Sequence, residues 1–435
     1  MKISNTYNEN ETNSFFIKEV ETTFINQNKN NEGQIIKNKL GLIDHNIRDL
    51  TKNNFSNQYK ETKNKRNFGI DFGRILAMLF IINHHIIYHG GPLFNTKVLS
   101  FDNDLLIFLN TLCCSGVNIF GMISGFVGFH SHKYTNLFYL LFETFFYNFG
   151  IAFFFKKTKV GIVNDLINFL FPLFISDYWY FNAYFTMYFF LPLLNKGIKI
   201  MEKREMGIFN LSLFLLFSCF NQIRHYSERF RKDFFLFVNG FTYMWLIILY
   251  FYGSYFGKFG NDFGYHNKFI FFLINCLILF FVTFLRSIII IYKMFHHSRG
   301  INMTVEYTSP SNVMISICFL NILSHLEIKK QFFQKIVSCL SPLTYGVYLL
   351  HNHILVRNYV IKNNYLWLIK KNRNSFVLIL IEILESLKIF FFCSFIDYIR
   401  FLIFKLLKLK QICSMIYQIQ KKIGYKILSL FEFYY

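Results

Sequence analysis

An arginine and a histidine inside one apolar stretch are the residues of this chain best suited to chemistry. The stretch reads "DFGRILAMLFIINHHIIYHGG", residues 71–91, and ten residues separate Arg74 from His85. A helix over 70–89, turning about 100° per residue, brings Asp71, Arg74, His85 and His89 onto one face. Imidazole titrates near neutral pH and can take a proton from a hydroxyl, while guanidinium is a permanent planar cation suited to phosphate. The pattern therefore permits proton transfer by His85, with an anionic group held by Arg74, on one face of a helix.

The same polar stripe also has a structural interpretation. Ionisable groups inside a membrane span are costly in hydrocarbon and usually face the bundle interior or a wet cavity. Arg74 can pair with Asp71, three residues earlier, and the histidines can bond to backbone or lipid headgroups. On this helix Asn83 and His84 point away from the stripe. The stripe alone leaves catalysis and structural pairing both open.

The composition is that of a membrane protein. The 435 residues are 53% hydrophobic and only 16% charged, which is too apolar for an ordinary soluble domain. The net charge of +21, from 46 Lys+Arg and 25 Asp+Glu, suits anionic lipid headgroups or an anionic substrate. No compact basic domain with interleaved aromatics is visible, so we expect no nucleic-acid partner. The eight cysteines mostly lie in apolar runs without metal-ligand spacing, and we expect them to be buried without a metal.

After Arg66 the chain consists of apolar segments of about the length that crosses a bilayer as a helix. The candidates are 70–89, 105–128, 136–155, 179–195, 207–220, 240–257, 269–292, 310–325, 342–360 and 376–397. The sequence thus predicts an all-α, polytopic membrane helical bundle of about ten transmembrane helices. The shorter stretch 162–176 is expected to be interfacial or re-entrant.

The chain divides into three regions by composition. Residues 1–66 are polar and are expected to form a disordered cytoplasmic extension, whereas 67–405 form the membrane domain. Residues 406–435 form a basic amphipathic tail, which is either a helix lying on an anionic membrane surface or a solvated basic tail. Most Lys- and Arg-rich loops fall on one side under a ten-helix count, which predicts that both termini are cytoplasmic. The basic clusters at 155–160, 228–233 and 369–374 fall on the other side.

Other polar or small residues within the spans have two interpretations each. Gly121 and Gly125 form a GxxxG ridge, for which close helix packing is the leading interpretation. Glu143 can orient an imidazole, or can be neutral or paired with a nearby lysine. Tyr184 can line an acceptor site or be an interfacial aromatic, and His351 can line a cavity or be a satisfied bundle histidine.

Two functions outside catalysis stay open on these residues alone. In a transporter or channel, the intramembrane histidines would relay protons or contact the solute. Transporters often contain internal repeats, and none is visible between the two halves of this chain. A catalytically silent membrane scaffold would tolerate replacement of Arg74 and His85.

The order and spacing of several segments resemble the acyltransferase-3 family. "NFGIDFGRILAMLFIINHHIIYHGG" looks like that family's first membrane helix. It is followed by the Gly-Val-Asn…Ser-Gly helix, the Tyr-Trp…Tyr…Pro helix and the Tyr-Gly-Val-Tyr-Leu-Leu-His helix, over roughly residues 67–405. Members of the family are integral membrane acyltransferases that typically O-acetylate surface polysaccharides and related glycans.

The resemblance implies a donor, an acceptor and site residues. The donor is acyl-CoA, with acetyl-CoA expected, which enters from the cytoplasm as a co-substrate, and no bound cofactor is implied. The acceptor is a hydroxyl group, expected on a glycan. The family's Arg–His signature maps onto Arg74 and His85, and two further positions map onto His351 and Arg357. His85 is then expected to act as general base, and Arg74 to orient the donor phosphates or stabilise the thioester oxygen.

The chain departs from the family pattern in three places. The polar N-terminal extension and the last thirty or so residues are additions. The loop "FHSHKYTNL" has fewer arginines than is usual for the family, with His130, His132 and Lys133 as its cations or potential cations. This loop leaves open how the phosphates of the donor are bound on that side.

Overall fold

The computed structural model of the chain describes residues 66–130, 134–156, 178–223, 237–260, 267–296, 306–370 and 374–432. Every regular element within these ranges is helical, as an all-α bundle requires. The predicted disordered extension, apart from Arg66, and the predicted interfacial stretch 162–176 lie outside the described residues.

Helices are present at each of the ten predicted segments, and two of the segments are broken. Continuous helices at seven segments are α3 (Phe68–Tyr88), α7 (Tyr134–Lys156), α9 (Trp179–Ile200), α12 (Tyr243–Phe259), α13 (Lys268–Phe295), α14 (Pro310–Ser324) and α19 (Ser375–Leu406). At 207–220, α10 (Lys203–Phe214) passes directly into the π-helix η3 (Leu215–Phe220). The first of the two broken segments is the second one along the chain, 105–128, which comprises α5 (Phe101–Cys113) and α6 (Gly116–Gly128). The ninth comprises η8 (Ser341–Leu343), α16 (Thr344–Asn352), α17 (Ile354–Val356) and η9 (Arg357–Ile361), so the expected continuous span over 342–360 is wrong.

Shorter helices connect these elements, and one long helix follows them. The connectors are α4 (Pro92–Asn95), α11 (Asn221–Ile223), η5 (Val238–Gly240), α15 (Gln331–Leu340) and α18 (Trp367–Lys370). The chain ends in α20 (Leu409–Glu432), which occupies the predicted amphipathic tail.

Four helical stretches in the described part of the chain are long and apolar enough to cross a membrane. They are Phe68–Asn95, Phe101–Gly128, Tyr134–Phe155 and Lys268–Phe295, and α14 is apolar but shorter. Only 11% of the most apolar window of α13 is buried, as is expected of a helix that faces lipid. The protein is therefore a helical membrane protein, and the count of about ten transmembrane helices stays a prediction.

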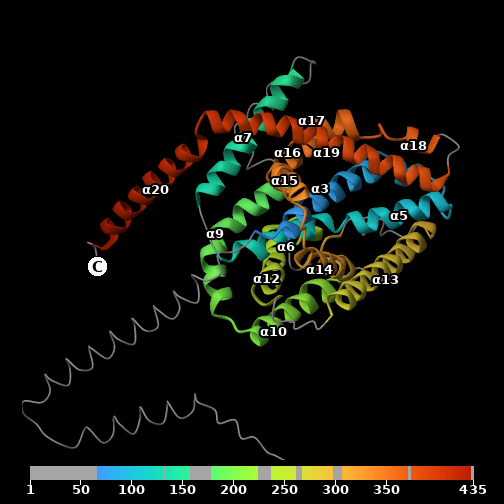
Figure 1. The fold of residues 1–435 in the computed structure, drawn as a ribbon, viewed down its shortest axis with the longest axis horizontal. Coiled ribbons are helices and arrows are strands. Elements are labelled where there is room, and N and C mark those ends of the chain that lie inside the picture. The colour runs from blue at the N-terminus through green and yellow to red at the C-terminus, as the bar shows by residue number, and fades with distance from the viewer. Residues whose placement is uncertain are drawn as a thin grey trace, which may run out of the picture. The chain divides into compact units, whose positions relative to one another are not determined.

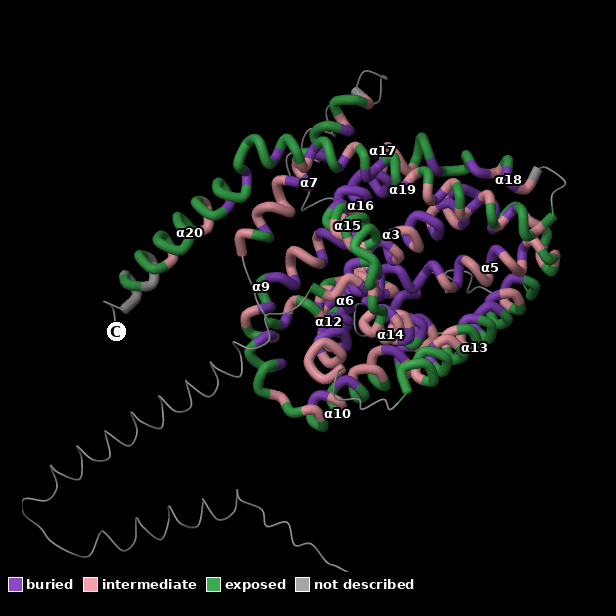
Figure 2. Tube along the Cα trace, in the orientation of Figure 1, coloured by how far each residue is buried: buried purple, intermediate pink, exposed green. Residues whose placement is uncertain are grey.

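Helix α3 occupies the middle of the bundle (Figure 1). It packs against α5, α6, α14, α15, α16 and α19. Buried residues concentrate on α3, α6 and α16, whereas α13 and α20 carry long exposed stretches (Figure 2). Polar side chains on α3 consequently contact protein on several sides.

Helices α3 and α19 run in opposite directions. The Asn83 amide lies 3.0 Å from the Ser386 hydroxyl. Further toward the start of α3, the Ser341 hydroxyl donates to the Asp71 carboxylate at 3.2 Å. Nearby on α16, a Cβ added at Gly346 would overlap the Asp397 carboxylate. The first turns of α3 therefore lie at the same end of the bundle as the last turns of α19, and His85 lies toward the opposite end.

The predicted small-residue ridge brings α6 and α12 into close contact. A Cβ added at Gly125 would overlap the backbone carbonyl of Tyr250, and one added at Gly253 would overlap that of Met122. Small residues let membrane helices approach until dispersion contacts between their backbones hold them together. The GxxxG pattern is thus explained by packing.

We expect Gly125→Leu to prevent assembly of the folded protein, because the added side chain has no space between α6 and α12. The matched control is Gly150→Leu on α7, where an added Cβ meets nothing within 4 Å. The yield of monodisperse protein after detergent extraction measures the effect. Equal yields of the two variants would contradict the packing account.

Candidate functional site

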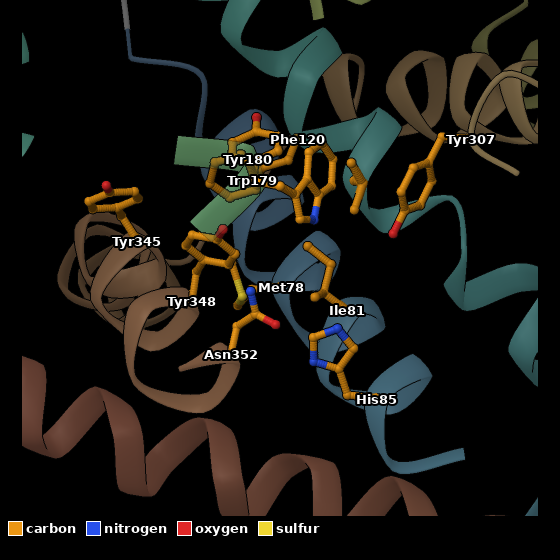
Figure 3. A pocket seen from close by; sticks show the side chains of 11 residues that line it. Met78, Ile81, His85, Phe120, Trp179, Tyr180, Tyr307, Tyr345, Tyr348 and Asn352 are labelled. Carbon is orange, nitrogen blue, oxygen red and sulfur yellow. The ribbon is translucent and has the colours of Figure 1, made fainter. Parts of the chain in front are cut away.

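A small cavity lies where α3, α6, α9 and α16 approach one another (Figure 3). Its volume is about 30 Å³, which holds a water molecule or a group of similar size. His85 is the lining residue with an imidazole. The lining residues are Met78, Ile81, His85, Val117, Phe120, Trp179, Tyr180, Tyr307, Tyr345, Tyr348 and Asn352. The cavity is therefore largely aromatic, with a few polar groups at fixed positions.

His85 stands next to two other histidine rings. Its ring centroid is 5.2 Å from that of His351 and 5.3 Å from that of His89. The Nδ1 atom of His351 lies 2.6 Å from the Val347 carbonyl oxygen, a geometry in which Nδ1 carries the hydrogen and donates. In the neutral ring Nε2 is then an acceptor. The structure thus brings together His85, His89 and His351, which the sequence singled out separately.

Two ring nitrogens of this group have no hydrogen-bond partner among the described residues. They are Nδ1 of His85 and Nε2 of His351, and both atoms are buried. Buried polar atoms without hydrogen-bond partners are rare in folded proteins and often mark a place where a ligand or water binds. A polar group of a ligand that reached either nitrogen would supply the missing partner.

The break after α16 places further polar residues at this end of the bundle. His353 has φ −55° and ψ 136°, which ends α16, and its Nδ1 accepts from the Leu355 backbone N–H at 3.2 Å. Its other nitrogen lies 3.3 Å from Oδ1 of Asn148 on α7. After the break, Arg357 lies close enough for its charge to act on His85, His89 and His351. The histidine group consequently has a cation beside it.

Arg74 lies apart from this cavity, toward the start of α3. Its guanidinium forms an ion pair with Asp71 at 2.5 Å, and 28% of its side chain is exposed. The structural pairing that the sequence left open is therefore present. Eleven residues further along the helix, His85 is about 16 Å away at a rise of 1.5 Å per residue.

A row of tyrosines connects the two positions. Tyr184 lies within electrostatic reach of Arg74. Its ring stacks on that of Tyr180, with centroids 6.4 Å apart and planes 15° apart, and Tyr180 lines the cavity. Tyr184 therefore lies between the Arg74 region and the cavity without lining the cavity itself.

The two polar residues expected to point away from the stripe do so. The ring of His84 contacts Oδ1 of Asn110 at 2.8 Å and the Cys114 thiol at 3.5 Å. Asn83 contacts Ser386 on α19, as described above. His84 is thus a buried histidine with partners of its own.

Glu143 does not orient a histidine. Its carboxylate forms an ion pair with Arg400 at 2.8 Å, and Arg400 also pairs with Asp397 at 2.7 Å. The Tyr147 hydroxyl donates to Asp397 at 2.6 Å. All three charged side chains are at most 3% exposed, so this buried cluster joins α7 to α19. Of the two interpretations of Glu143, pairing with a cation is the one present, although the cation is an arginine on another helix and not a nearby lysine.

Several cavity residues were not foreseen from the sequence. Trp179 and Tyr307 stack with centroids 5.7 Å apart and planes 22° apart, and both face the cavity. Tyr348 and Asn352 come from the helix that ends "YGVYLLHN". Their signal was the clustering of aromatics around predicted site residues, which is weak in a chain that is 21% aromatic. Within the described ranges, no group of three or more His, Cys, Asp or Glu side chains could hold a metal ion.

Comparison with known proteins identifies the family. Residues 67–396 match the acyltransferase-3 family model, described as an acyltransferase domain. No curated protein and no solved structure matches the chain. The matched region covers most of the chain, contains the four helices that surround the cavity, and ends before α20. The chain therefore belongs to the acyltransferase-3 family of membrane acyltransferases.

Proposed function

We propose that this protein transfers an acetyl group from acetyl-CoA to a hydroxyl group of a glycan, with His85 as the general base. The observation that carries the proposal is the placement of His85 at a cavity beside His351, each ring with one buried nitrogen that has no partner among the described residues. The family supplies the reaction class, acyl transfer.

The reaction requires one proton to be moved. The acceptor oxygen attacks the carbonyl carbon of the thioester, so that a C–O bond forms and the C–S bond breaks. His85 takes the hydroxyl proton during attack, and the departing thiolate of CoA receives it. Positioned proton transfer of this kind is worth about 10² to 10⁴ in rate. His351, fixed by its bond to the Val347 carbonyl, orients the reacting groups through its free nitrogen.

Arg74 binds the donor at the cytoplasmic end of the bundle in this scheme. Coenzyme A carries its phosphates at one end of a long flexible chain and its thiol at the other, so both ends can be held at once. Arg74 contacts the phosphates, Asp71 holds the guanidinium in place, and the chain passes Tyr184 to bring the thioester to His85. His89 and Arg357 then belong to the acceptor side of His85. Both termini are cytoplasmic in this arrangement.

The small volume of the cavity favours a short acyl group, and its aromatic wall favours a sugar as the acceptor. A cavity of about 30 Å³ suits an acetyl group better than a long acyl chain. The stacked pair of Trp179 and Tyr307 offers an apolar aromatic surface with polar edges. Such a surface suits the C–H face of a sugar ring. The family match also favours acyl transfer over a transporter that uses the same histidines.

Membranes that contain the protein, incubated with acetyl-CoA radiolabelled in the acetyl group, test the function. We expect the label to appear in the glycan fraction. Alkaline hydroxylamine should release this label, because it cleaves oxygen esters. Label confined to lipid, peptide or small molecules would overturn the glycan acceptor. If these membranes incorporate no more label than membranes that lack the protein, acetyl-CoA is not the donor.

A further inference from the structure

A second and larger cavity lies at the junction of α19 and α20, outside the region that matches the family. Its volume is about 290 Å³, near the lower end of small-ligand pockets, which span roughly 300–1,000 Å³. Its lining residues are Tyr139, Phe401, Phe404, Lys405, Lys408, Leu409, Lys410 and Gln411. All but Tyr139 follow residue 396, where the family match ends. The cavity is therefore built largely by residues that follow the matched region.

Three lysines surround this cavity. Lys405, Lys408 and Lys410 are all exposed, and none of them forms an ion pair within the described residues. No acidic side chain lines the cavity. The first turn of α20 adds its backbone N–H groups, the positive end of the helix dipole. Positive charges gathered without an acid are stabilised by an anion.

The wall of the cavity is held in place by neighbouring contacts. The Tyr139 hydroxyl accepts from Nη1 of Arg400 at 3.0 Å, and the Lys410 ammonium lies 5.9 Å from the centre of the Tyr139 ring. Phe404 packs edge-on against Tyr139 with centroids 5.7 Å apart. Leu409 and Cys413 are buried in the same apolar cluster, which anchors the start of α20. The three lysines thus surround a cavity whose aromatic wall is fixed by packing and hydrogen bonding.

The surface beside the lysines is apolar. Leu406 is 81% exposed and Leu407 is 60% exposed, directly between the basic residues in the chain. On α20, Ile412, Met415, Ile419 and Ile423 are also exposed and fall on one face at helical spacing. A free anion in water gains nothing from such a surface. A phospholipid gains from both parts, because its phosphate can meet the lysines while its acyl chains cover the leucines and isoleucines.

We propose that this cavity binds the phosphate headgroup of an anionic phospholipid, with Lys405, Lys408 and Lys410 as the phosphate ligands and α20 lying on the membrane surface. The site is at the same end of the bundle as Arg74, because Asp397 near the end of α19 and Asp71 at the start of α3 both lie close to the segment that begins at Ser341. Lipid binding here is independent of acyl transfer, and its test uses neither donor nor acceptor.

Delipidated full-length protein in detergent is titrated with dioctanoyl phosphatidylglycerol or dioctanoyl phosphatidylcholine, and native mass spectrometry counts the bound lipid. We expect phosphatidylglycerol to bind at least about tenfold more tightly, since its headgroup carries a net negative charge that the three lysines attract, whereas the headgroup of phosphatidylcholine is neutral overall. The variant Lys405→Gln/Lys408→Gln/Lys410→Gln should bind the two lipids equally.

The matched control removes the same charge from α20, further along the chain from the cavity. Lys421→Gln/Lys422→Gln/Lys426→Gln should keep the preference of the unchanged protein. The site would be overturned if both triple variants lost the preference for phosphatidylglycerol equally. It would also be overturned if the unchanged protein showed no preference for phosphatidylglycerol over phosphatidylcholine. Displacement of phosphatidylglycerol by an equal concentration of inorganic phosphate would show a free-anion site and overturn the lipid assignment.

Discussion

His85→Gln should lower the rate of acetyl transfer by about 10² to 10⁴, because glutamine can donate and accept hydrogen bonds but cannot take up the proton of the acceptor hydroxyl. His85 is partly exposed at the cavity, and its side chain makes no hydrogen bond within the described part of the chain, so replacing this side chain breaks no existing bond. We therefore expect the folded amount to be unchanged. Turnover with purified protein, normalised to the folded amount, measures the effect.

His84 provides the control for this variant, since it is the adjacent residue on the same helix and points elsewhere. Its ring contacts Asn110 and Cys114 instead of the cavity. His84→Gln should cost some stability, because a buried ring loses its partners. Transfer per folded molecule should stay within a few fold. Equal activity in the two variants would mean that His85 is not the base.

Arg400→Met should destabilise the bundle by about 3–5 kcal/mol, because it leaves buried carboxylates without their cation. Glu143 and Asp397 are 3% and 0% exposed, and Arg400 lies between them at 2.8 Å and 2.7 Å. Arg400 also donates to the Tyr139 hydroxyl, so the substitution also removes a hydrogen bond from the wall of the cavity between α19 and α20. Thermal unfolding in detergent measures the effect.

Lys388→Met on the same helix is the matched control for Arg400→Met. Lys388 pairs with Glu385 at 3.2 Å, but its side chain is 74% exposed. An exposed pair of this kind contributes about 0–1 kcal/mol. The midpoint of Lys388→Met should therefore stay near that of the unchanged protein. Equal midpoints for the two variants would contradict the view that Arg400 holds α7 and α19 together.

The polar stripe of α3 was predictable because helical periodicity fixes which residues share a face. The pattern placed Asp71 beside Arg74 and His85 beside His89, and turned His84 away, and each of these relations is present. Periodicity does not show which neighbouring helix each residue meets. The contact of His85 with His351 joins segments far apart in the sequence, and the family resemblance gave the reason to consider them together.

Glu143 shows why a buried charge is hard to interpret from one sequence. Its partner Arg400 is on another helix and 257 positions away, and no local pattern couples the two. A visible signal was the spacing of Asp397 and Arg400, three residues apart on one helix face. That pair indicates a buried ion pair on α19, but it does not show that Glu143 is the second acid bound to Arg400.

The break in the ninth segment was also missed, for a local reason. The run "TYGVYLLHNHILVRNYV" contains no proline and is apolar enough to be read as one helix. His353 ends α16 through its own side chain, which accepts from the Leu355 backbone N–H and contacts Asn148 on α7. Tertiary contact thus overrides helical propensity at the point where the chain passes the histidine group.

The charges within α19 illustrate why membrane crossing is harder to establish than helix position. This helix has 32 residues, yet Glu382, Asp397 and Arg400 lie within it and are buried by neighbouring helices. A hydropathy threshold counts these residues as polar, although protein and not lipid surrounds them. Helix position follows from sequence more readily than the number of crossings.

The central claim is that Arg74 and His85, about 16 Å apart along α3 at 1.5 Å per residue, serve one reaction on a donor that reaches both. Comparing acetyl-CoA with a short acetyl thioester that lacks phosphates tests it directly. Arg74→Ala should lower kcat/KM about 10- to 100-fold with acetyl-CoA, as the loss of a charged hydrogen bond implies, and should have no effect with the short thioester. His85→Gln should lower transfer from both donors by about 10² to 10⁴. Equal sensitivity of the two donors to Arg74→Ala, or full activity of His85→Gln with either donor, would contradict the account.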